Sequence, residues 1–241
     1  MVQVIIVTGA SRGIGLAVAT YLLRPPHQRN VVVVARTSGP LENLQSQYPG
    51  QVEVIAGDLA EYETAKRAVD GAVGRWGRLD GLVLNHGTLD PVKRIRDSVI
   101  ADWEGSFKIN VFSCVEFVKT ALPHLRHSKG RIILTSSGAA QNAYSTWGAY
   151  GASKAALNHL GLTLSVEEPD ITTISIRPGV VDTDMQREIR ETHVANMDAQ
   201  DAEKFGSLKR EGKLLKPEQP GYVMAKLVMD ARKELSGRFL T

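Results

Sequence analysis

Residues 4–15 read VIIVTGASRGIG, an apolar run that passes directly into a glycine-rich turn. The run suits a buried strand, and residues 16–23 after the turn have the pattern of a helix. Glycine adopts backbone angles closed to other residues, so such a turn can bring its amides close to a phosphate at the positive end of the helix. The spacing Gly-x-x-x-Gly-x-Gly differs from the common Gly-x-Gly-x-x-Gly fingerprint, but the same mechanism applies. A plain turn without a ligand is the alternative.

Apolar runs alternate with helical stretches along the rest of the chain. The continuous runs suit strands that are covered on both faces of a parallel sheet. The 241 residues therefore predict a single α/β domain, a Rossmann-type doubly wound parallel β-sheet flanked by helices on both faces. The further strands are expected at Val31–Ala35, Val52–Ala56, Gly81–Asn85, Arg131–Thr135 and Thr172–Arg177.

A second pattern, Tyr150-Gly151-Ala152-Ser153-Lys154, places a phenol and an ammonium group four residues apart on the helical stretch 149–168. Residues four apart lie on one face of a helix. The charge of Lys154 is expected to lower the pKa of the Tyr150 phenol from its usual value of about 10. The pair predicts an acid–base catalyst. An exposed helical pair without a catalytic role is the alternative.

The two patterns together resemble the classical short-chain dehydrogenase/reductase family, and the resemblance covers nearly the whole chain. Other family motifs follow in order: an Asn-Ala-Gly segment, a helix asparagine, a catalytic serine and a Pro-Gly segment. The resemblance implies a nicotinamide-dependent oxidoreductase. Its motifs correspond here to Thr8–Gly15, Asn85-His86-Gly87, Asn110, Ser137, Tyr150 with Lys154, and Pro178–Thr183.

The resemblance implies a catalytic set of Asn110, Ser137, Tyr150 and Lys154. In a carbonyl reduction, Tyr150 donates the proton, Ser137 holds the carbonyl oxygen, Lys154 also binds the nicotinamide ribose, and Asn110 holds a relay water. Otherwise Asn110 could satisfy backbone groups and Ser137 could cap a strand end. The implied cofactor-binding residues are Gly9, Ser11, Arg12, Gly13, Ile14, Gly15, Arg36, Thr37, Asp58, Leu59, Asn85, Gly87, Tyr150, Lys154, Pro178, Gly179, Val181 and Thr183.

The form of the cofactor depends on the charge at the end of the second strand. An acid there would bond a ribose 2′-hydroxyl, whereas this chain has Arg36. Arg36 and Arg12 could together bind a 2′-phosphate, so NADP(H) is expected. If both arginines pair with acids instead, NAD(H) stays open. The resemblance places Asp58 beside the adenine, with a helix cap as the alternative.

The substrate region is expected between Ser137 and Tyr150 and in the loop and helix region 180–216. Both segments resemble the subgroup that contains sepiapterin reductase and the benzil reductases that form (S)-benzoin. An apolar and aromatic wall would suit a 1,2-diketone or an aromatic ketone such as benzil, reduced to the (S)-alcohol. Ordinary packing is the alternative for the aromatic residues. The expected substrate residues are Ser137, Tyr144, Trp147, Val180 and Met185.

Two other functions stay open. A sepiapterin-type pterin reductase would have an acid beyond the last strand, whereas this chain ends Gly237-Arg238-Phe239-Leu240-Thr241. A regulatory protein that binds NADP(H) without turnover would tend to lack the tyrosine or the lysine. His86 replaces a small residue of the family motif, and a structural or cofactor-lining role is favoured over a catalytic base.

The net charge of +3 comes from scattered residues, so no nucleic-acid partner is expected. The single cysteine, Cys114, excludes an internal disulfide and a cysteine-based metal site, and no metal is expected. It lies in an apolar helix, which predicts burial. Without a secretory signal or an apolar run of membrane-spanning length, a cytoplasmic protein with no membrane partner is expected. The resemblance implies a homodimer or homotetramer through helices 110–125 and 149–168.

Overall fold

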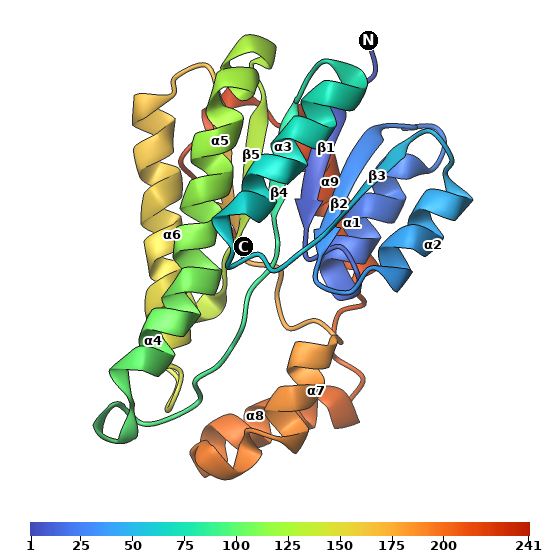
Figure 1. The fold of residues 1–241 in the computed structure, drawn as a ribbon. Helices are drawn as coiled ribbons and strands as arrows, with labels where there is room; N and C mark the ends of the chain where they lie inside the picture. The colour runs from blue at the N-terminus through green and yellow to red at the C-terminus, as the bar shows by residue number, and fades with distance from the viewer.

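A single sheet of seven strands runs through the chain, which a computed structural model describes from residue 1 to residue 241 (Figure 1). Neighbouring strands all pair in parallel, in the order β3-β2-β1-β4-β5-β6-β7. The predicted doubly wound α/β fold is therefore confirmed. The strands are β1 (Val4–Thr8), β2 (Asn30–Ala35), β3 (Val52–Ala56), β4 (Gly81–Leu84), β5 (Arg131–Thr135), β6 (Thr172–Ile176) and β7 (Phe239–Leu240).

Three long helices cover each face of the sheet (Figure 1). Strand residues alternate between two separate hydrophobic cores, because successive side chains of a strand point to opposite faces. Ile6 of β1 belongs to one core and Ile5 to the other, and both are fully buried. One face carries α3 (Tyr62–Trp76), α5 (Ser113–Ser128) and α6 (Gly148–Glu167); the other carries α1 (Gly13–Leu23), α2 (Gly39–Gln47) and α9 (Glu218–Asp230).

The strand ends differ slightly from the sequence expectation. β4 ends at Leu84 and β6 at Ile176, one residue earlier than expected in each case. β7 was not predicted, because two residues carry no period from which a strand could be recognised. It pairs with β6 at the edge of the sheet.

The helix that contains Asn110 is interrupted. α4 (Ile100–Phe107) continues through a π-turn at Lys108–Phe112 into α5. At the end of the π-turn the N–H of Ser113 donates to the Lys108 carbonyl, five residues back. Such bulges occur mostly as single turns inside α-helices and frequently at functional sites.

The expected substrate region 180–216 forms an excursion whose two ends are joined. Val181 and Leu215 form a parallel bridge, with hydrogen bonds Asp182 N to Leu215 O and Leu215 N to Val180 O. Between these ends lie α7 (Asp184–Glu191) and α8 (Ala199–Arg210), which stand beyond the end of the sheet in Figure 1. None of the helices combines the length and the apolar composition that crossing a membrane requires.

Candidate active site

A cleft of about 640 Å³ opens at the carboxyl ends of the strands. The strand order reverses between β1 and β4, and ligands of such sheets bind at this switch point. The cleft brings together residues that follow β1, β2, β3, β4, β5 and β6, together with side chains of α6, α7 and α8. Of the predicted site residues, all line this cleft except Gly15, Asp58 and Asn110.

The glycine turn has the backbone that its sequence predicts. Gly9 and Gly13 have φ values of +64° and +56°, which disfavour other residues. The Cβ of any residue replacing Gly15 would lie 2.2 Å from the Gly9 carbonyl oxygen, so Gly15 lets α1 approach the turn closely. α1 starts without an acidic side chain or a side-chain cap. Its first amides remain available for an anion, which fits the pyrophosphate of a dinucleotide.

Tyr150, Ser137 and Lys154 meet in the cleft at the end of β5. Tyr150 is 8% exposed and Lys154 is 3% exposed. The Lys154 Nζ donates to the Thr135 carbonyl over 2.8 Å and lies 5.7 Å from the centroid of the Tyr150 ring. The Ser137 Oγ accepts from the Ala139 N–H at 3.2 Å, so it caps the short turn after β5 as well as lining the cleft.

The expected lowering of the Tyr150 pKa is wrong for this structure. Burial disfavours the phenolate and raises the pKa of Tyr150, while a hydrogen bond with the Ser137 side chain opposes the rise. Burial also lowers the pKa of Lys154 to about 8. At neutral pH the structure therefore favours a protonated phenol beside a lysine that is close to losing its charge.

Asn110 lies behind the cleft and is fully buried. Its Oδ1 accepts from the Thr88 N–H at 2.8 Å, and its Nδ2 donates to the Thr88 carbonyl at 2.9 Å. The Nδ2 also lies 3.1 Å from the Ser153 Oγ, one residue before Lys154 on α6. The carboxamide thus joins the loop after β4 to α6. This supports the alternative that Asn110 satisfies backbone groups, and it also places the residue beside Lys154.

The two arginines expected at the 2′-phosphate differ in their partners. Arg12 makes an ion pair of 2.9 Å with Asp184, although its side chain stays 65% exposed. Arg36 lines the cleft at the end of β2 and makes no ion pair. Asp58 is exposed outside the cleft, and its Oδ1 accepts from the Ala60 N–H at 2.9 Å. Asp58 therefore stabilises the turn before α3 and is not the helix cap considered as its alternative role, because the N-cap of α3 is Glu61. Its contact with an adenine stays a prediction.

An aromatic cluster forms one wall of the cleft near Tyr150. The Trp147 ring stacks on Phe205 of α8 at 5.2 Å between centroids, and Tyr144 lies 4.9 Å from Trp147. Trp147 also meets the Tyr150 ring edge-on at 5.8 Å. Val180 and Met185 pack against the same cluster. Leu89, Ile189, Met197 and Phe205 also belong to this cluster, and no motif in the sequence marks them as site residues.

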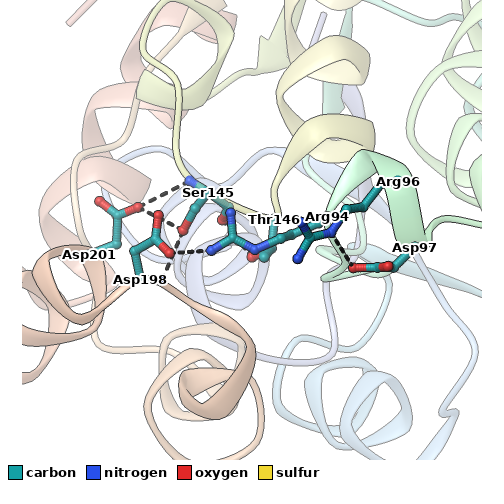
Figure 2. A network of polar contacts seen from close by, with 7 residues as sticks. All are labelled: Arg94, Arg96, Asp97, Ser145, Thr146, Asp198 and Asp201. Atoms are coloured by element: carbon teal, nitrogen blue, oxygen red, sulfur yellow. Dashed lines mark hydrogen bonds and ion pairs between the residues drawn. The ribbon is translucent and has the colours of Figure 1, made fainter.

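Polar contacts hold α8 against the loop before α6, as Figure 2 shows. The Asp201 Oδ2 accepts from the N–H of Ser145 at 3.1 Å and from its hydroxyl at 3.2 Å. The N–H of Asp198 donates to the Ser145 Oγ at 3.0 Å, and Arg94 pairs with the Asp198 carboxylate. These bonds hold α8, which carries Phe205, next to the loop that carries Tyr144 and Trp147. The aromatic end of the cleft is therefore built from two segments that are far apart in the sequence.

Cys114 is fully buried, as its apolar surroundings in the sequence predict. Its Sγ lies 3.4 Å from the Asn110 carbonyl oxygen, and burial raises the pKa of the thiol to about 11. An uncharged thiol is a poor nucleophile, so Cys114 acts as packing. His86 lines the cleft but is only 6% exposed, with hydrogen-bond partners at both ring nitrogens.

The cleft, its glycine turn and the Ser137, Tyr150 and Lys154 constellation define an oxidoreductase of the short-chain dehydrogenase class. The sequence model of the short chain dehydrogenase family matches residues 3–194. The chain therefore belongs to this family.

Similar proteins are found among oxidoreductases of fungi and bacteria. A benzil reductase ((S)-benzoin forming) of Saccharomyces cerevisiae is 39% identical, over 100% of this chain and 95% of its own length. An uncharacterized oxidoreductase of Schizosaccharomyces pombe is 40% identical, over 99% of this chain and 95% of its own. The crystal structure of the KRED1-Pglu enzyme is 41% identical, with a TM-score of 0.96 over 98% of this chain and 99% of its own.

Proposed function

We propose that the protein is an NADPH-dependent carbonyl reductase that converts a 1,2-diketone or aromatic ketone such as benzil into the (S)-alcohol. The observation that carries the proposal is the aromatic wall of Tyr144, Trp147 and Phe205, which reaches Tyr150 through the edge of Trp147. Flat aromatic groups pack favourably on such rings. A substrate ring held there has its carbonyl within reach of the Tyr150 and Ser137 hydroxyls.

The relatives support this substrate class. Proteins named benzil reductase ((S)-benzoin forming) from Saccharomyces cerevisiae and Bacillus cereus are 39% and 33% identical to this chain. A diketone or aromatic ketone is therefore favoured over sepiapterin.

The residues of the cleft support each part of a reduction. The glycine turn and Arg36 would hold a nicotinamide cofactor, which would supply the hydride for the carbonyl carbon. Tyr150 donates its phenolic proton to the carbonyl oxygen, and its raised pKa keeps that proton in place near neutral pH. Ser137 donates a hydrogen bond to the same oxygen and stabilises its developing charge. The positive charge of Lys154 then favours the phenolate that remains.

The cofactor preference belongs to the proposal. The glycine turn and the free amides of α1 fit a pyrophosphate, and Arg36 is a free guanidinium at the end of β2. Arg12 is exposed enough to exchange Asp184 for a phosphate. Guanidinium and phosphate form charge-assisted bonds, which the 2′-hydroxyl of NADH cannot replace. NADP(H) is therefore the expected cofactor.

A cytoplasmic location and a homo-oligomer complete the proposal. A solved structure described as a cytoplasmic protein of Saccharomyces cerevisiae is 38% identical, with a TM-score of 0.83. Large apolar side chains remain exposed on α5 and α6: Phe112 next to α5, Val115, Leu162 and Val166. Water-exposed apolar patches of this kind mark protein interfaces.

Steady-state kinetics with two diketones test the substrate and the cofactor together. NADPH with benzil is expected to be the best pair, NADH slower, and sepiapterin poor. Phe205→Ala should raise the KM for benzil several-fold, up to about tenfold, and leave a small aliphatic diketone unaffected, because stacking is lost. Arg36→Ala should weaken NADPH binding about tenfold or more without changing NADH binding.

Arg96→Ala, at an exposed residue outside the cleft, is the control for the arginine substitution. Equal use of NADPH and NADH by the unaltered protein would contradict the cofactor proposal. A KM for benzil that is unchanged in Phe205→Ala would contradict the role of the aromatic wall.

A further inference from the structure

His86 joins the end of β1 to the π-turn that carries Asn110. Its side chain is buried, at 6% exposure. The Nδ1 lies 2.7 Å from the Thr8 Oγ1, where the glycine turn begins. The Nε2 lies 2.7 Å from the Ser113 Oγ and 3.2 Å from the Ile109 carbonyl oxygen. Both nitrogens are therefore held by partners from different elements.

The partners select the neutral ring with its proton on Nε2. The Ser113 hydroxyl donates to the Ile109 carbonyl over 2.6 Å, so both oxygens present acceptors to Nε2. The Nδ1 is then an acceptor for the Thr8 hydroxyl at 2.7 Å, a shorter contact than the 3.3 Å from this hydroxyl to the Val83 carbonyl. Burial and the nearby charge of Lys154 lower the pKa of His86 to about 3. The ring therefore stays neutral throughout the working range of an enzyme, and its donor always faces the π-turn.

The contact between His86 and the π-turn gives the Ile109 carbonyl a hydrogen-bond partner that it would not have in a regular α-helix. In an α-helix the Ser113 N–H would donate to Ile109, four residues back, but here it donates to Lys108. The Ile109 oxygen accepts from the side chains of Ser113 and His86. Each hydrogen bond to this partly buried carbonyl is expected to contribute stability, so the bonds from Ser113 and His86 stabilise the π-turn.

The π-turn in turn sets the position of Asn110 beside Lys154. The Asn110 carboxamide is bonded to Thr88 on one side and to Ser153 on the other. A Cβ on Gly87 would lie 3.1 Å from the Asn110 Oδ1 and 3.4 Å from the Lys154 Nζ. Both side chains thus lie against the same piece of backbone. A shift of the π-turn would move the carboxamide away from the lysine.

We propose that His86 is a positioning residue for the reduction, whose neutral ring holds the Ile109 carbonyl and so keeps Asn110 beside Lys154. This inference rests on the proposed function. His86 exchanges no proton with the substrate and has no contact with the Tyr150 hydroxyl; it acts only through the π-turn. A residue that merely fills space at position 86 would preserve the packing and lose this effect.

Kinetics of two variants of similar size separate positioning from packing. His86→Gln keeps an N–H donor near Nε2, whereas His86→Met fills the space without one. With NADPH and benzil, kcat is expected to fall about tenfold or more in His86→Met and to be mostly retained in His86→Gln. The KM for NADPH should change little in both. His127→Met, at an exposed position near the end of α5, is the control.

The pH dependence adds a readout that packing alone would not move. In His86→Met, a shift of the π-turn away from Lys154 should leave the ammonium group better solvated, weaken the effect of burial and move the alkaline limb of kcat to higher pH. Ser113→Ala removes the other donor to Ile109 and should change kcat in the same direction by a smaller factor. If His86→Met does not fold, Ser113→Ala tests the positioning role in its place.

Hydrogen exchange of residues 108–113 gives a result that does not depend on turnover. These amides should exchange faster in His86→Met and Ser113→Ala than in the unaltered protein or His86→Gln. Unchanged exchange of these amides in His86→Met would overturn the inference. So would a loss of kcat that is the same at every pH and is fully explained by a smaller fraction of folded protein. If the unaltered protein binds NADPH but reduces no carbonyl, the proposed function fails, while the exchange data still show whether His86 holds the turn.

Discussion

Tyr150 and Lys154 show how burial sets protonation at the scale of single residues. Burial raises the pKa of the phenol and lowers the pKa of the ammonium to about 8, because both charged forms lose solvation. A protonated Tyr150 beside a charged Lys154 is the state that a reduction requires. The Ser137 side chain lines the same cleft and would supply a second donor to a carbonyl oxygen bound there.

The pH dependence of reduction follows from these two shifts. Lys154 carries its charge below pH about 8 and loses it above, so the rate of reduction should fall as the pH rises through about 8. Tyr150, with its raised pKa, should keep its proton over that range and impose no earlier limit. Initial rates of benzil reduction from neutral to alkaline pH measure this limb. A rate that stays constant until well above the ordinary pKa of lysine would contradict the assignment.

The sequence pattern predicts a catalytic set, and its members meet in the cleft, but the pattern does not predict their proton affinities. Tyr150 and Lys154 lie on one predicted helix, and Ser137 ends the run before it, so local patterns were sufficient to find them. The pKa expectation for Tyr150 failed because its burial depends on Trp147 and other residues that pack around it. His86 was recognised as unusual, but its bonds to the π-turn required three-dimensional information.

At the scale of elements, the glycine turn holds α1 against the end of β1. A methyl group on Gly15 would lie 2.2 Å from the Gly9 carbonyl oxygen and 2.7 Å from the Asn85 Nδ2. The Gly9 carbonyl oxygen belongs to the backbone, so it cannot rotate away as a side-chain atom could. The close approach of helix and strand therefore depends on glycine at this position.

Gly15→Ala is expected to lower the Tm and to weaken NADPH binding, because α1 must move away from the turn that holds the pyrophosphate. Gly74→Ala in α3 is the matched control, since nothing lies within 4 Å of its added methyl group. That change should stabilise the protein, by about 0.5–1 kcal/mol, through better helix propensity. Thermal unfolding and NADPH titration of both variants measure the contrast, and equal effects would contradict it.

The segment of α7 and α8 is held closed by the contacts of Ser145 with Asp198 and Asp201 (Figure 2). Its aromatic residue Phe205 lines the cleft and stacks on Trp147. Sequence patterns predicted that residues 180–216 would contribute to the substrate site. They could not show which side chains face inward, since that depends on a contact between positions 145 and 201.

Ser145→Ala combined with Asp201→Asn should loosen this segment. Loss of these bonds is expected to cost about 0.5–1.5 kcal/mol each, which corresponds to a several-fold higher KM for benzil. Hydrogen exchange of residues 184–210 should become faster. Asp70→Asn, which breaks an exposed ion pair on α3, is the control and should change neither quantity. Unchanged exchange in the double variant would show that other contacts hold the segment.

At the scale of the whole molecule, two hydrophobic cores fix the sheet between its helix layers. The alternation of strands and helices was legible in the sequence because the strands are buried on both faces and read as continuous apolar runs. The short strand β7 and the π-turn could not be predicted from the sequence, since neither has a local sequence pattern. The sequence also does not show which apolar side chains of α5 and α6 are buried in the core and which are exposed, because that depends on the three-dimensional packing.

A homodimer or homotetramer should form through those side chains. Replacing both Phe112 and Leu162 by aspartate is expected to reduce the assembly, because charge would have to be buried in an apolar interface. Light scattering coupled to size-exclusion chromatography measures the mass of both proteins. A control with Val223→Asp, at an exposed residue of α9, should keep the assembly. A monomeric unaltered protein would contradict the expectation.

The most direct measurement is the rate of NADPH oxidation with benzil, for the unaltered protein and for Tyr150→Phe, together with NADPH binding by both. The account predicts rapid formation of (S)-benzoin by the unaltered protein and a loss of about 10²–10⁴-fold in kcat for the variant. NADPH binding should be similar in the two proteins. An equal rate in Tyr150→Phe would contradict the role of the phenol. Tight NADPH binding without turnover of any carbonyl would contradict the enzymatic function and point to a regulatory binding protein.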